Sequence, residues 1–564
     1  MPARIVPDHV RRTVLGLSVP GLYVGAGFFL ISWSPSLLPR TWYYQGIISG
    51  ICAGAGYGIG VVAGWLLARL ARLVQLEIRV SREAGRWLQM GWHVLAAAVV
   101  VGLTVANVRS QGRTAAYVHL SPPGPVDWLK SILLALLILA LFIVIVRGLR
   151  RLTKRLAEAA GQVLPATIAS VCAVIVVTMV AAWVGDSVVF HRVMQRFGTI
   201  AAQVNEQPPE GVSPPTSPLK SGSPESLESY ARLGYEGQMF VTSAPTPAQI
   251  QAATGEPAIE PIRVYAGRHA DEPLEQVADQ VVAELHRTGA FERSVIAVLT
   301  STGTGWVDDW SVQAIEYLTG GDSAVASMQY SYLPSAMSIM TDRETPGDAG
   351  RILFNKVYAA LQDMPPSQRP KLVVGGESLG SYGGQAAFTG VDDMMRRSDG
   401  GVWIGTPSFT EIAAELTASR NQGSPEIVPV IDDGRHIRFA ASAENLTHDY
   451  YGRPYGAWAF PRFVYAQHPS DPIVWWNPAV LGAQPDWLRE PRGRDVNPDV
   501  TWIPFVTFWQ LTTDMAVGHD PPDGYGHRYG AELVPAWGAV LGSDPTRDYT
   551  RLIAGVTRTV HRTE

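Results

Sequence analysis

The chain has 564 residues, of which 47% are hydrophobic and 17% are charged, and its formal net charge is −5. This length allows several domains, and the acidic second part of the chain carries no basic stripe of the kind that binds nucleic acid. The only two cysteines, Cys52 and Cys172, lie in apolar runs, which excludes a disulfide framework. No histidine spacing indicates a zinc site, and we expect neither a metal nor a cofactor.

Positive charge is concentrated in the first part of the chain. Residues 1–200 contain 19 Lys and Arg against 6 Asp and Glu, whereas residues 201–564 contain 26 against 44. A basic, apolar front joined to an acidic remainder indicates two different environments rather than two similar domains.

Five apolar stretches in the front part are each about 20 residues long, which is enough to cross a bilayer. They cover 13–33, 47–70, 88–108, 128–146 and 164–184. The first resembles a signal peptide, but four further spans favour an uncleaved anchor. Closely spaced glycines in the second, from Gly50 to Gly60, favour tight helix packing. We therefore predict a helical transmembrane domain over residues 1–200, with the lipid bilayer as its partner.

Arginine and lysine gather in alternate loops between these spans. They occur before the first span (Arg4, Arg11 and Arg12), at 69–86 and at 147–155, while the other loops hold few. Positive loops face the cytoplasm, so we expect a cytoplasmic N-terminus in a cell membrane. Five spans then place everything after residue 190 on the extracytoplasmic side, and an even number of spans would reverse this.

Residues 201–235 are predicted to be a linker, because 207–226 are rich in Pro, Ser and Gly and cannot bury a core. From 236 to 564, apolar strands alternate with helices. We expect strands at 262–265, 295–299, 324–330, 372–374, 402–404 and 463–466, and helices at 272–287, 310–318, 350–361, 385–388 and from 529. This alternation indicates a mostly parallel sheet covered by helices on both faces.

The strand at 372–374 runs directly into Gly376-Glu377-Ser378-Leu379-Gly380. Strand, tight turn and helix are the context that a G-x-S-x-G nucleophile elbow needs. Gly376 and Gly380 lack bulk where the strand and helix converge, so Ser378 is the predicted nucleophile. The amide of Leu379 is expected to face a developing oxyanion. A chance match is the alternative in a chain with 55 glycines, but the flanking strand and helix favour the elbow.

A serine nucleophile needs a base, and the base needs an acid to orient it. In this kind of fold the chain order is serine, acid, histidine. Asp471, in the loop after the strand at 463–466, is the predicted acid; a turn or helix-cap role is its alternative. Asp432 and Asp433 are also candidates, but their Asp-Asp-Gly sequence is typical of a hairpin turn.

For the base we favour His527, which lies just before the helix expected from 529, over His519. The second oxyanion donor is expected in the glycine-rich loop after the strand at 295–299. Thr302, Gly303 and Thr304 are its candidates, because backbone amides exposed in such a loop can point at a negative oxygen. An ordinary turn explains this loop equally well.

These residues lie in motifs that resemble those of a known family, the multi-pass membrane α/β-hydrolases common in actinobacteria. The motifs are Ser36–Trp42, Lys220–Pro224, Thr302–Val307, Gln329–Ser335, Gly376–Ser381 and Gly526–Tyr529. The resemblance covers nearly the whole chain. It implies an N-terminal membrane domain, an α/β-hydrolase catalytic domain over 236–564, Ser378 as nucleophile and His527 as the histidine of a Gly-His-x-Tyr motif. Asp471 rests on chain order rather than on a motif.

We therefore expect a membrane-anchored serine hydrolase, esterase- or lipase-like, that cleaves acyl esters through an acyl-enzyme. Its position at a membrane favours lipid or cell-envelope substrates. Two alternatives stay open: an acyltransferase with the same triad, and a non-catalytic membrane scaffold or receptor that keeps the fold. A peptidase is less favoured. Tryptophans at 475, 476, 487 and 502–509 fit an acyl-binding wall and core packing equally well.

Overall fold

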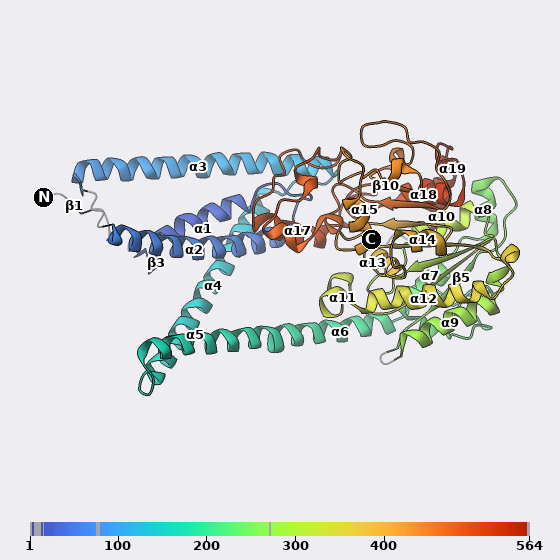
Figure 1. Ribbon diagram of the computed structural model, residues 1–564, viewed down its shortest axis with the longest axis horizontal. Helices are drawn as coiled ribbons and strands as arrows, with labels where there is room; N and C mark the ends of the chain where they lie inside the picture. The colour runs from blue at the N-terminus through green and yellow to red at the C-terminus, as the bar shows by residue number, and fades with distance from the viewer. Residues whose placement is uncertain (1–2, 5–12, 15, 75–78, 270–271, 561–564) are drawn as a thin grey trace. The chain divides into compact units, whose positions relative to one another are not determined.

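The computed structural model describes residues 3–4, 13–14, 16–74, 79–269 and 272–560. The chain divides into two compact units, whose helices and strands are labelled in Figure 1. The first unit comprises residues up to 188 together with 478–488 and 494–521; the second comprises 189–477, 489–493 and 522–564. Two segments from the C-terminal part of the sequence thus belong to the N-terminal unit. Arg11 and Arg12, used above for the charge argument, lie outside the described residues.

The first unit is mainly helical. Its long helices are α1 (Val19–Ile31), α2 (Trp42–Leu73), α3 (Arg82–Tyr117), α4 (Pro125–Ala160) and α5 (Ala166–Trp183). A π-helical segment, Val184–Phe190, connects α5 to α6 (His191–Glu206). Two short antiparallel pairs join β1 (Ala3–Arg4) to β4 (Arg79–Val80) and β2 (Thr13–Val14) to β3 (Leu17–Ser18).

Four helices are long and apolar enough to cross a membrane: Trp42–Leu73, Glu83–Tyr117, Pro125–Ala160 and the continuous Ala166–Glu206. They contain the last four predicted spans. The first predicted span contains only α1, which has 13 residues and is therefore about 20 Å long, shorter than the ~30 Å hydrocarbon core of a bilayer. The described residues thus provide four long apolar helices where the sequence predicted five spans, and the orientation that needs an odd count stays a prediction.

The glycines of α2 allow close packing, as the sequence predicted. A Cβ atom on Gly60 would lie 2.5 Å from the carbonyl oxygen of Pro20 in α1. A Cβ atom on Gly50 would lie 2.7 Å from the side chain of Ile138 in α4. No real side chain tolerates such distances, so small residues on α2 let both neighbouring helices approach its backbone.

The segment 494–521 packs into the first unit through α17 (Val506–Asp514). This helix contacts α2, where Val506 joins Cys52 in a buried apolar cluster. At its other end, the Asp514 carboxylate accepts a hydrogen bond from the amide of Leu37, in the loop between α1 and α2 (3.2 Å). Short helices at Pro478–Leu481, Asp486–Leu488 and Met515–Val517 belong to the same unit.

The second unit is built around a seven-stranded sheet with the order β10-β11-β9-β8-β6-β7-β5. Every neighbouring pair is parallel. The strands are β5 (Ile262–Ala266), β6 (Val295–Thr300), β7 (Ser323–Met328), β8 (Lys371–Glu377), β9 (Gly400–Ile404), β10 (Ile437–Ala440) and β11 (Arg462–Ala466). Every residue of β6 and β9 is buried, because helices cover both faces of a parallel sheet.

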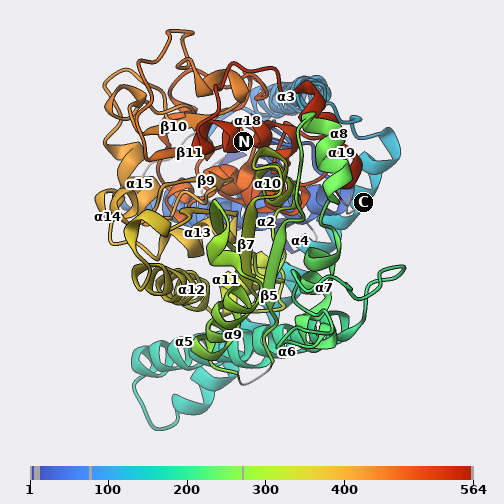
Figure 2. The ribbon, with the colours of Figure 1, turned by 90° about the vertical axis from the view of Figure 1, so that its right-hand side faces the viewer.

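Figure 2 shows helices on the two faces of this sheet. One face carries α9 (Leu274–Arg287), α12 (Thr345–Gln362), α13 (Leu379–Gln385), α14 (Val391–Arg397) and α15 (Glu411–Ala418). The other carries α7 (Gly234–Thr242), α8 (Pro247–Thr254), α10 (Asp309–Leu318), α18 (Leu533–Leu541) and α19 (Thr550–Thr559). The predicted fold, a helical region with long apolar helices followed by a parallel sheet with helices on both faces, is confirmed.

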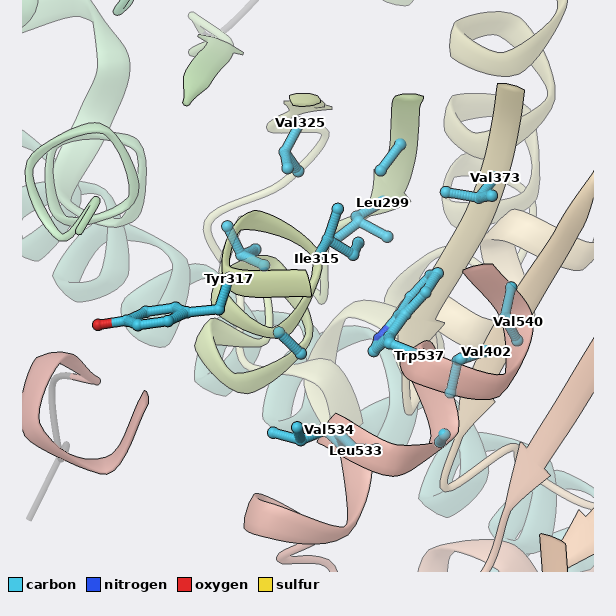
Figure 3. Packing of buried hydrophobic residues seen from close by; sticks show 14 of the residues in the cluster. Leu299, Ile315, Tyr317, Val325, Val373, Val402, Leu533, Val534, Trp537 and Val540 are labelled. Atoms are coloured by element: carbon cyan, nitrogen blue, oxygen red, sulfur yellow. The ribbon is translucent and has the colours of Figure 1, made fainter. Parts of the chain in front are cut away.

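The core beneath α10 and α18 is shown in Figure 3. Trp537 of α18 is fully buried and lies beside strand residues Leu299 and Val402. Ile315 of α10 lies beside Leu299. Burial of these side chains holds both helices against the sheet.

Several elements differ from the sequence prediction, among them helices α7, α8, α14 and α15, which were not predicted. Strand β10, a buried strand at the edge of the sheet, was not predicted, because its charged residue Arg438 made the segment look polar. The buried guanidinium donates to the carbonyl oxygens of Leu446 and Gly456. Helix α13 begins at Leu379, directly after the elbow serine, rather than at 385, since its glycine-rich sequence gives little helical signal. Helix α18 is followed by α19, so it is not the last helix of the described chain.

The predicted linker is not a free tether over its whole length. Lys220 forms a bridge with Arg263 of β5, and the amide of Ser221 donates to the carbonyl oxygen of Arg263 (3.1 Å). The Ser221 hydroxyl also donates to Glu284 of α9, as does the amide of Leu227 (3.0 and 2.7 Å). Hydrogen bonds to β5 and α9, together with packing of Leu219 against the core, therefore hold 219–227 in place, which a composition argument does not reveal.

The remaining elements of the second unit are short. They are α11 (Ser335–Thr341), α16 (Pro472–Trp475) and 3-10 helices at Tyr230–Leu233, Ala290–Glu292, Pro366–Gln368, Asp432–Gly434, Ala443–Leu446 and Gly530–Glu532.

Candidate active site

Ser378 lies in the turn between β8 and α13. Its backbone has φ 54° and ψ −118°, a conformation that side chains rarely adopt and that is typical of a nucleophile elbow. Its amide donates to the carbonyl oxygen of Ile404 in the neighbouring strand β9 (2.9 Å). A Cβ atom on Gly376 would lie 2.5 Å from the backbone of Gly380, and one on Gly380 would lie 2.3 Å from the carbonyl oxygen of Thr300. Both flanking positions therefore require glycine.

The predicted base and acid, His527 and Asp471, lie in contact although they are 56 residues apart in sequence. His527 Nδ1 is 2.6 Å from Asp471 Oδ2, and the exposed fractions of the two side chains are 1% and 0%. Asp471 follows β11 and also caps α16, because it accepts a hydrogen bond from the amide of Ile473 (2.9 Å). The cap role and the contact with histidine therefore coexist.

Gly405, the residue after β9, packs closely against the imidazole of His527. Its φ is +52°, and a Cβ atom there would lie 2.3 Å from Cε1 of His527. Since the preceding carbonyl accepts from the Ser378 amide, the serine and the histidine lie at the same end of the sheet. Within the described residues the Ser378 side chain makes no cap hydrogen bond to α13.

Asp471 is held in its charged form by its neighbours. Burial alone would raise the pKa of Asp471, but attraction to His527 and hydrogen bonds from His527, Tyr529 and the Ile473 amide hold it below its usual value. The Tyr529 hydroxyl donates to the same oxygen as the imidazole, at 2.7 Å. A carboxylate in this position accepts from Nδ1–H and so presents Nε2 as the basic nitrogen.

His468 joins the loop of the acid to the loop of the base, a role that the sequence did not indicate. Its Nδ1 lies 2.9 Å from the carbonyl oxygen of Gly526, and its Nε2 lies 2.8 Å from a carboxylate oxygen of Glu532. Its ring stacks on Tyr529 with centroids 4.1 Å apart. Tyr529, the tyrosine of the Gly-His-x-Tyr motif, thus contacts both Asp471 and His468. The motif was the only feature of the sequence that pointed to a role for Tyr529.

Glu377 is a further acidic group at the site that sequence reasoning missed. It is 5% exposed, and its Oε1 lies 3.5 Å from Nε2 of His527. Burial, together with the charges of Asp308 and Asp471, raises the pKa of Glu377 well above its usual value. It occupies the second position of the G-x-S-x-G motif, which carries no residue preference and therefore gave no signal.

The predicted oxyanion residues lie close to the elbow but differ in their hydrogen bonds. Leu379 is the first residue of α13, and the first amides of a helix lack intrahelical acceptors. The amide of Thr302 donates to the carbonyl oxygen of Trp306 (2.8 Å) and closes its loop. The amide of Gly303 donates to the hydroxyl of Ser335 at 3.3 Å.

The alternative sequence candidates are not part of this cluster. Asp432 and Asp433 are exposed and precede β10, so they lie at the amino end of the sheet, whereas Ser378 lies at the carboxyl end. His519 is exposed and belongs to the first unit. Trp475 is buried and donates to the carbonyl oxygen of His468 (3.1 Å), which favours core packing for this tryptophan. Within the described residues no group of three or more His, Cys, Asp or Glu is arranged to hold a metal ion.

Two family models match the chain. A family model described as "Alpha/beta-hydrolase family N-terminus" matches residues 33–245, and one described as "Alpha/beta-hydrolase family" matches 262–552. Among solved structures, a Trichoderma reesei cutinase in complex with a C11Y4 phosphonate inhibitor is similar at 15% identity, with 43% of this chain and 85% of that chain covered and a TM-score of 0.18. No curated protein matches. Because the second family model alone spans just over half of the sequence, the chain belongs to the alpha/beta-hydrolase family.

Proposed function

We propose that this protein is a membrane-anchored serine hydrolase that cleaves acyl esters. The observation that carries the proposal is the 2.6 Å contact between His527 Nδ1 and Asp471 Oδ2, at the end of the sheet where Ser378 occupies a strained elbow. Family membership supports the hydrolase fold, and four long apolar helices support attachment to a membrane.

In this mechanism Ser378 Oγ attacks the ester carbonyl carbon while His527 Nε2 takes its proton. The bond between the carbonyl carbon and the alcohol oxygen then breaks, and the imidazolium returns the proton to the departing alcohol. Water, deprotonated by the same nitrogen, attacks the acyl group on Ser378 and releases the acid. Asp471 keeps Nδ1 protonated throughout and stabilises the imidazolium by its charge.

We assign the oxyanion donors to the amides of Leu379 and Gly303. The Thr302 amide closes its own loop, so redirecting it would break that turn. The Gly303 amide makes a 3.3 Å bond to a hydroxyl, which can rotate away. A Cβ atom at Gly303 would lie 2.5 Å from the carbonyl oxygen of Leu333, so the loop accepts only glycine at this position.

The proposed substrates are lipid or cell-envelope esters at the extracytoplasmic face. Attachment to a bilayer supports such substrates. The clusters of positive residues at 69–86 and 147–155 lie at or beyond the C-terminal ends of the first and third of the four long apolar helices, so they support this orientation of the chain after the fourth helix whether or not 13–33 also spans. An acyltransferase would form the same acyl-enzyme, and only a product that depends on an added alcohol separates it from a hydrolase. A non-catalytic scaffold would form no acyl-enzyme.

The test is labelling of the full-length protein, purified in detergent, with a fluorophosphonate probe. We expect the wild type and the matched control His519→Ala to label equally. Ser378→Ala should not label, and His527→Ala should label at least about 100-fold more slowly, because general-base catalysis contributes at least this factor. A folded wild type that does not label, or equal labelling of Ser378→Ala, would refute the proposal.

A further inference from the structure

His468 binds the residue that immediately precedes the proposed base. Its side chain is fully buried, and its Nδ1 lies 2.9 Å from the carbonyl oxygen of Gly526. A carbonyl oxygen only accepts hydrogen bonds, so Nδ1 carries a hydrogen and donates it. The amide of Gly526 in turn donates to the hydroxyl of Ser470 at 2.8 Å. Both backbone groups of Gly526 are therefore bonded to the loop that carries Asp471, the proposed acid.

Two neighbours fix the orientation of the His468 ring. Its Nε2 lies 2.8 Å from Oε2 of Glu532, and its face stacks on the ring of Tyr529 with the two planes inclined by 13°. Two lone pairs would repel each other at this distance, so a hydrogen lies between Nε2 and the carboxyl group. As with Asp471 and His527, a carboxyl group bonded to one nitrogen of the ring directs the other.

We propose, on the basis of the serine hydrolase function, that His468 is a positioning residue, which places the His527 imidazole by holding the Gly526 carbonyl group. The planar peptide bond joins this carbonyl group rigidly to the nitrogen and Cα of His527. Gly526 itself has φ +56°, in the region that glycine enters freely, so its own backbone restrains the next peptide plane little.

Loss of the bond from Nδ1 frees this peptide plane to rotate. Rotation moves the imidazole of His527 relative to Ser378 and Asp471. A displacement of about 1 Å in a reacting group can slow the chemical step about 100-fold. Substrate binding does not use this imidazole, so the effect belongs in kcat rather than in KM.

The two bonds of the His468 ring can be removed one at a time. The side-chain nitrogen of asparagine lies close to the position of Nδ1, that of glutamine lies close to the position of Nε2, and both are donors. His468→Asn therefore keeps the bond to Gly526 and loses the bond to Glu532, whereas His468→Gln does the reverse. Because a bond to a carboxylate is the stronger one, a purely structural role makes His468→Asn the more damaging change. The positioning role predicts the opposite order of activity.

The experiment measures kcat and KM for p-nitrophenyl butyrate at neutral pH, with the full-length protein in detergent and Ser378→Ala as the blank. His468→Asn should lower kcat by no more than about threefold, the effect of a modest local adjustment. His468→Gln should lower kcat about 10- to 100-fold with KM unchanged. His468→Phe, which keeps a ring against Tyr529 but neither bond, should lower kcat at least as much. Arg528→Gln, which breaks an exposed ion pair with Asp523 in the same loop, is the matched control and should leave kcat unchanged.

The outcomes separate this inference from the function on which it rests. A wild type that neither hydrolyses the ester nor labels with fluorophosphonate refutes both. An active wild type with equal kcat values in His468→Asn and His468→Gln refutes the role of His468 alone, as does a lower kcat in His468→Asn. A rise in KM without a fall in kcat in His468→Gln also refutes it. If His468→Gln does not fold, the same comparison is made between His468→Asn and His468→Phe, and equal kcat values then refute the role.

Discussion

Arg40 and Asp514 form a buried ion pair in the first unit that we expect to weaken the fold at neutral pH. Arg40 Nη1 lies 3.7 Å from Asp514 Oδ1, and both side chains are 0% exposed. Asp514 Oδ2 also accepts from the amides of Leu37 and Leu38 and from the Ser36 hydroxyl. Burial nevertheless raises the pKa of Asp514 to about 6 and lowers the pKa of Arg40. Both shifts indicate that removing the two charges from water destabilises the charged pair by more than the attraction between the charges stabilises it.

The magnitude follows from the shift of the carboxyl group. A pKa of 3.8 in the unfolded chain and about 6 in the folded protein differ by about 2 units, or about 3 kcal/mol. The folded state binds the Asp514 proton more tightly than the unfolded chain does. The stabilisation of the fold by this proton is therefore fully present below pH 3.8 and is lost as pH rises through about 6. We expect the contact of α17 with α2 to be up to about 3 kcal/mol weaker at pH 7 than at pH 4. Asp514→Asn, a neutral mimic of the protonated acid, should remove this pH dependence.

The thiol of Cys52 provides a local assay, because it is buried beside Val506 of α17. Changing Cys172 to serine leaves Cys52 as the only thiol in the chain. The rate of its reaction with a disulfide reagent, divided by the rate of a free thiol at each pH, gives the free energy of local opening.

Asp520→Asn is the matched control, because Asp520 is exposed and its pKa is also raised by partial burial. This variant should keep the main pH dependence. An opening free energy that stays constant between pH 4 and pH 7 in the wild type would refute the reasoning, as would an unchanged slope in Asp514→Asn. A loss of about 3–5 kcal/mol at pH 7 in Asp514→Asn would mean that the attraction outweighs desolvation.

Three further predictions concern the second unit. Tyr529→Phe removes a hydrogen bond to the Asp471 carboxylate, worth about 1.5–3 kcal/mol, so kcat/KM for a chromogenic ester should fall about 10- to 100-fold with the fold unchanged by circular dichroism. Gly405→Ala places a methyl group on the His527 ring at a positive φ and should abolish fluorophosphonate labelling; normal labelling would contradict the geometry. Trp537→Ala empties a fully buried position and should cost about 3–5 kcal/mol, measured as an earlier urea transition.

The site residues that could be predicted from sequence are those marked by their neighbours in the chain or by their order along it. Ser378 lies in a strand, a glycine-flanked turn and a helix, and each of these is encoded by neighbouring residues. Asp471 and His527 were found because chain order within this fold restricts where an acid and a base can occur. Asp471 lies at the carboxyl end of the sheet because it follows β11, whereas His527 follows no strand, and its loop is held beside Asp471 by the bonds of Gly526 to His468 and of Tyr529 to Asp471.

The parts that were not predictable depend on contacts between distant residues without a pattern of their own. Ser36 and Asp514 are hydrogen-bonded across 478 residues, and neither residue type indicates such a partner. Glu377 occupies a variable position of the elbow motif, so the sequence gave no reason to place it near the histidine. Only the structure shows that its carboxyl group approaches the imidazole. Arg438 made a buried strand look polar, because its guanidinium is satisfied by carbonyl groups from later loops.

The helical unit also contains most of the chain that connects the proposed acid to the proposed base. Between Asp471 and His527 the chain passes from the second unit into the first. Residues 478–488 and 494–521 belong to the first unit, and the second unit resumes at Pro522. Those residues are held there by buried apolar contacts with α2 and by hydrogen bonds to the loop between α1 and α2. Any change that loosens α17 therefore lengthens the free chain between the proposed acid and the proposed base. The sequence motif Ser36–Trp42 lies in and just after the loop that binds this helix.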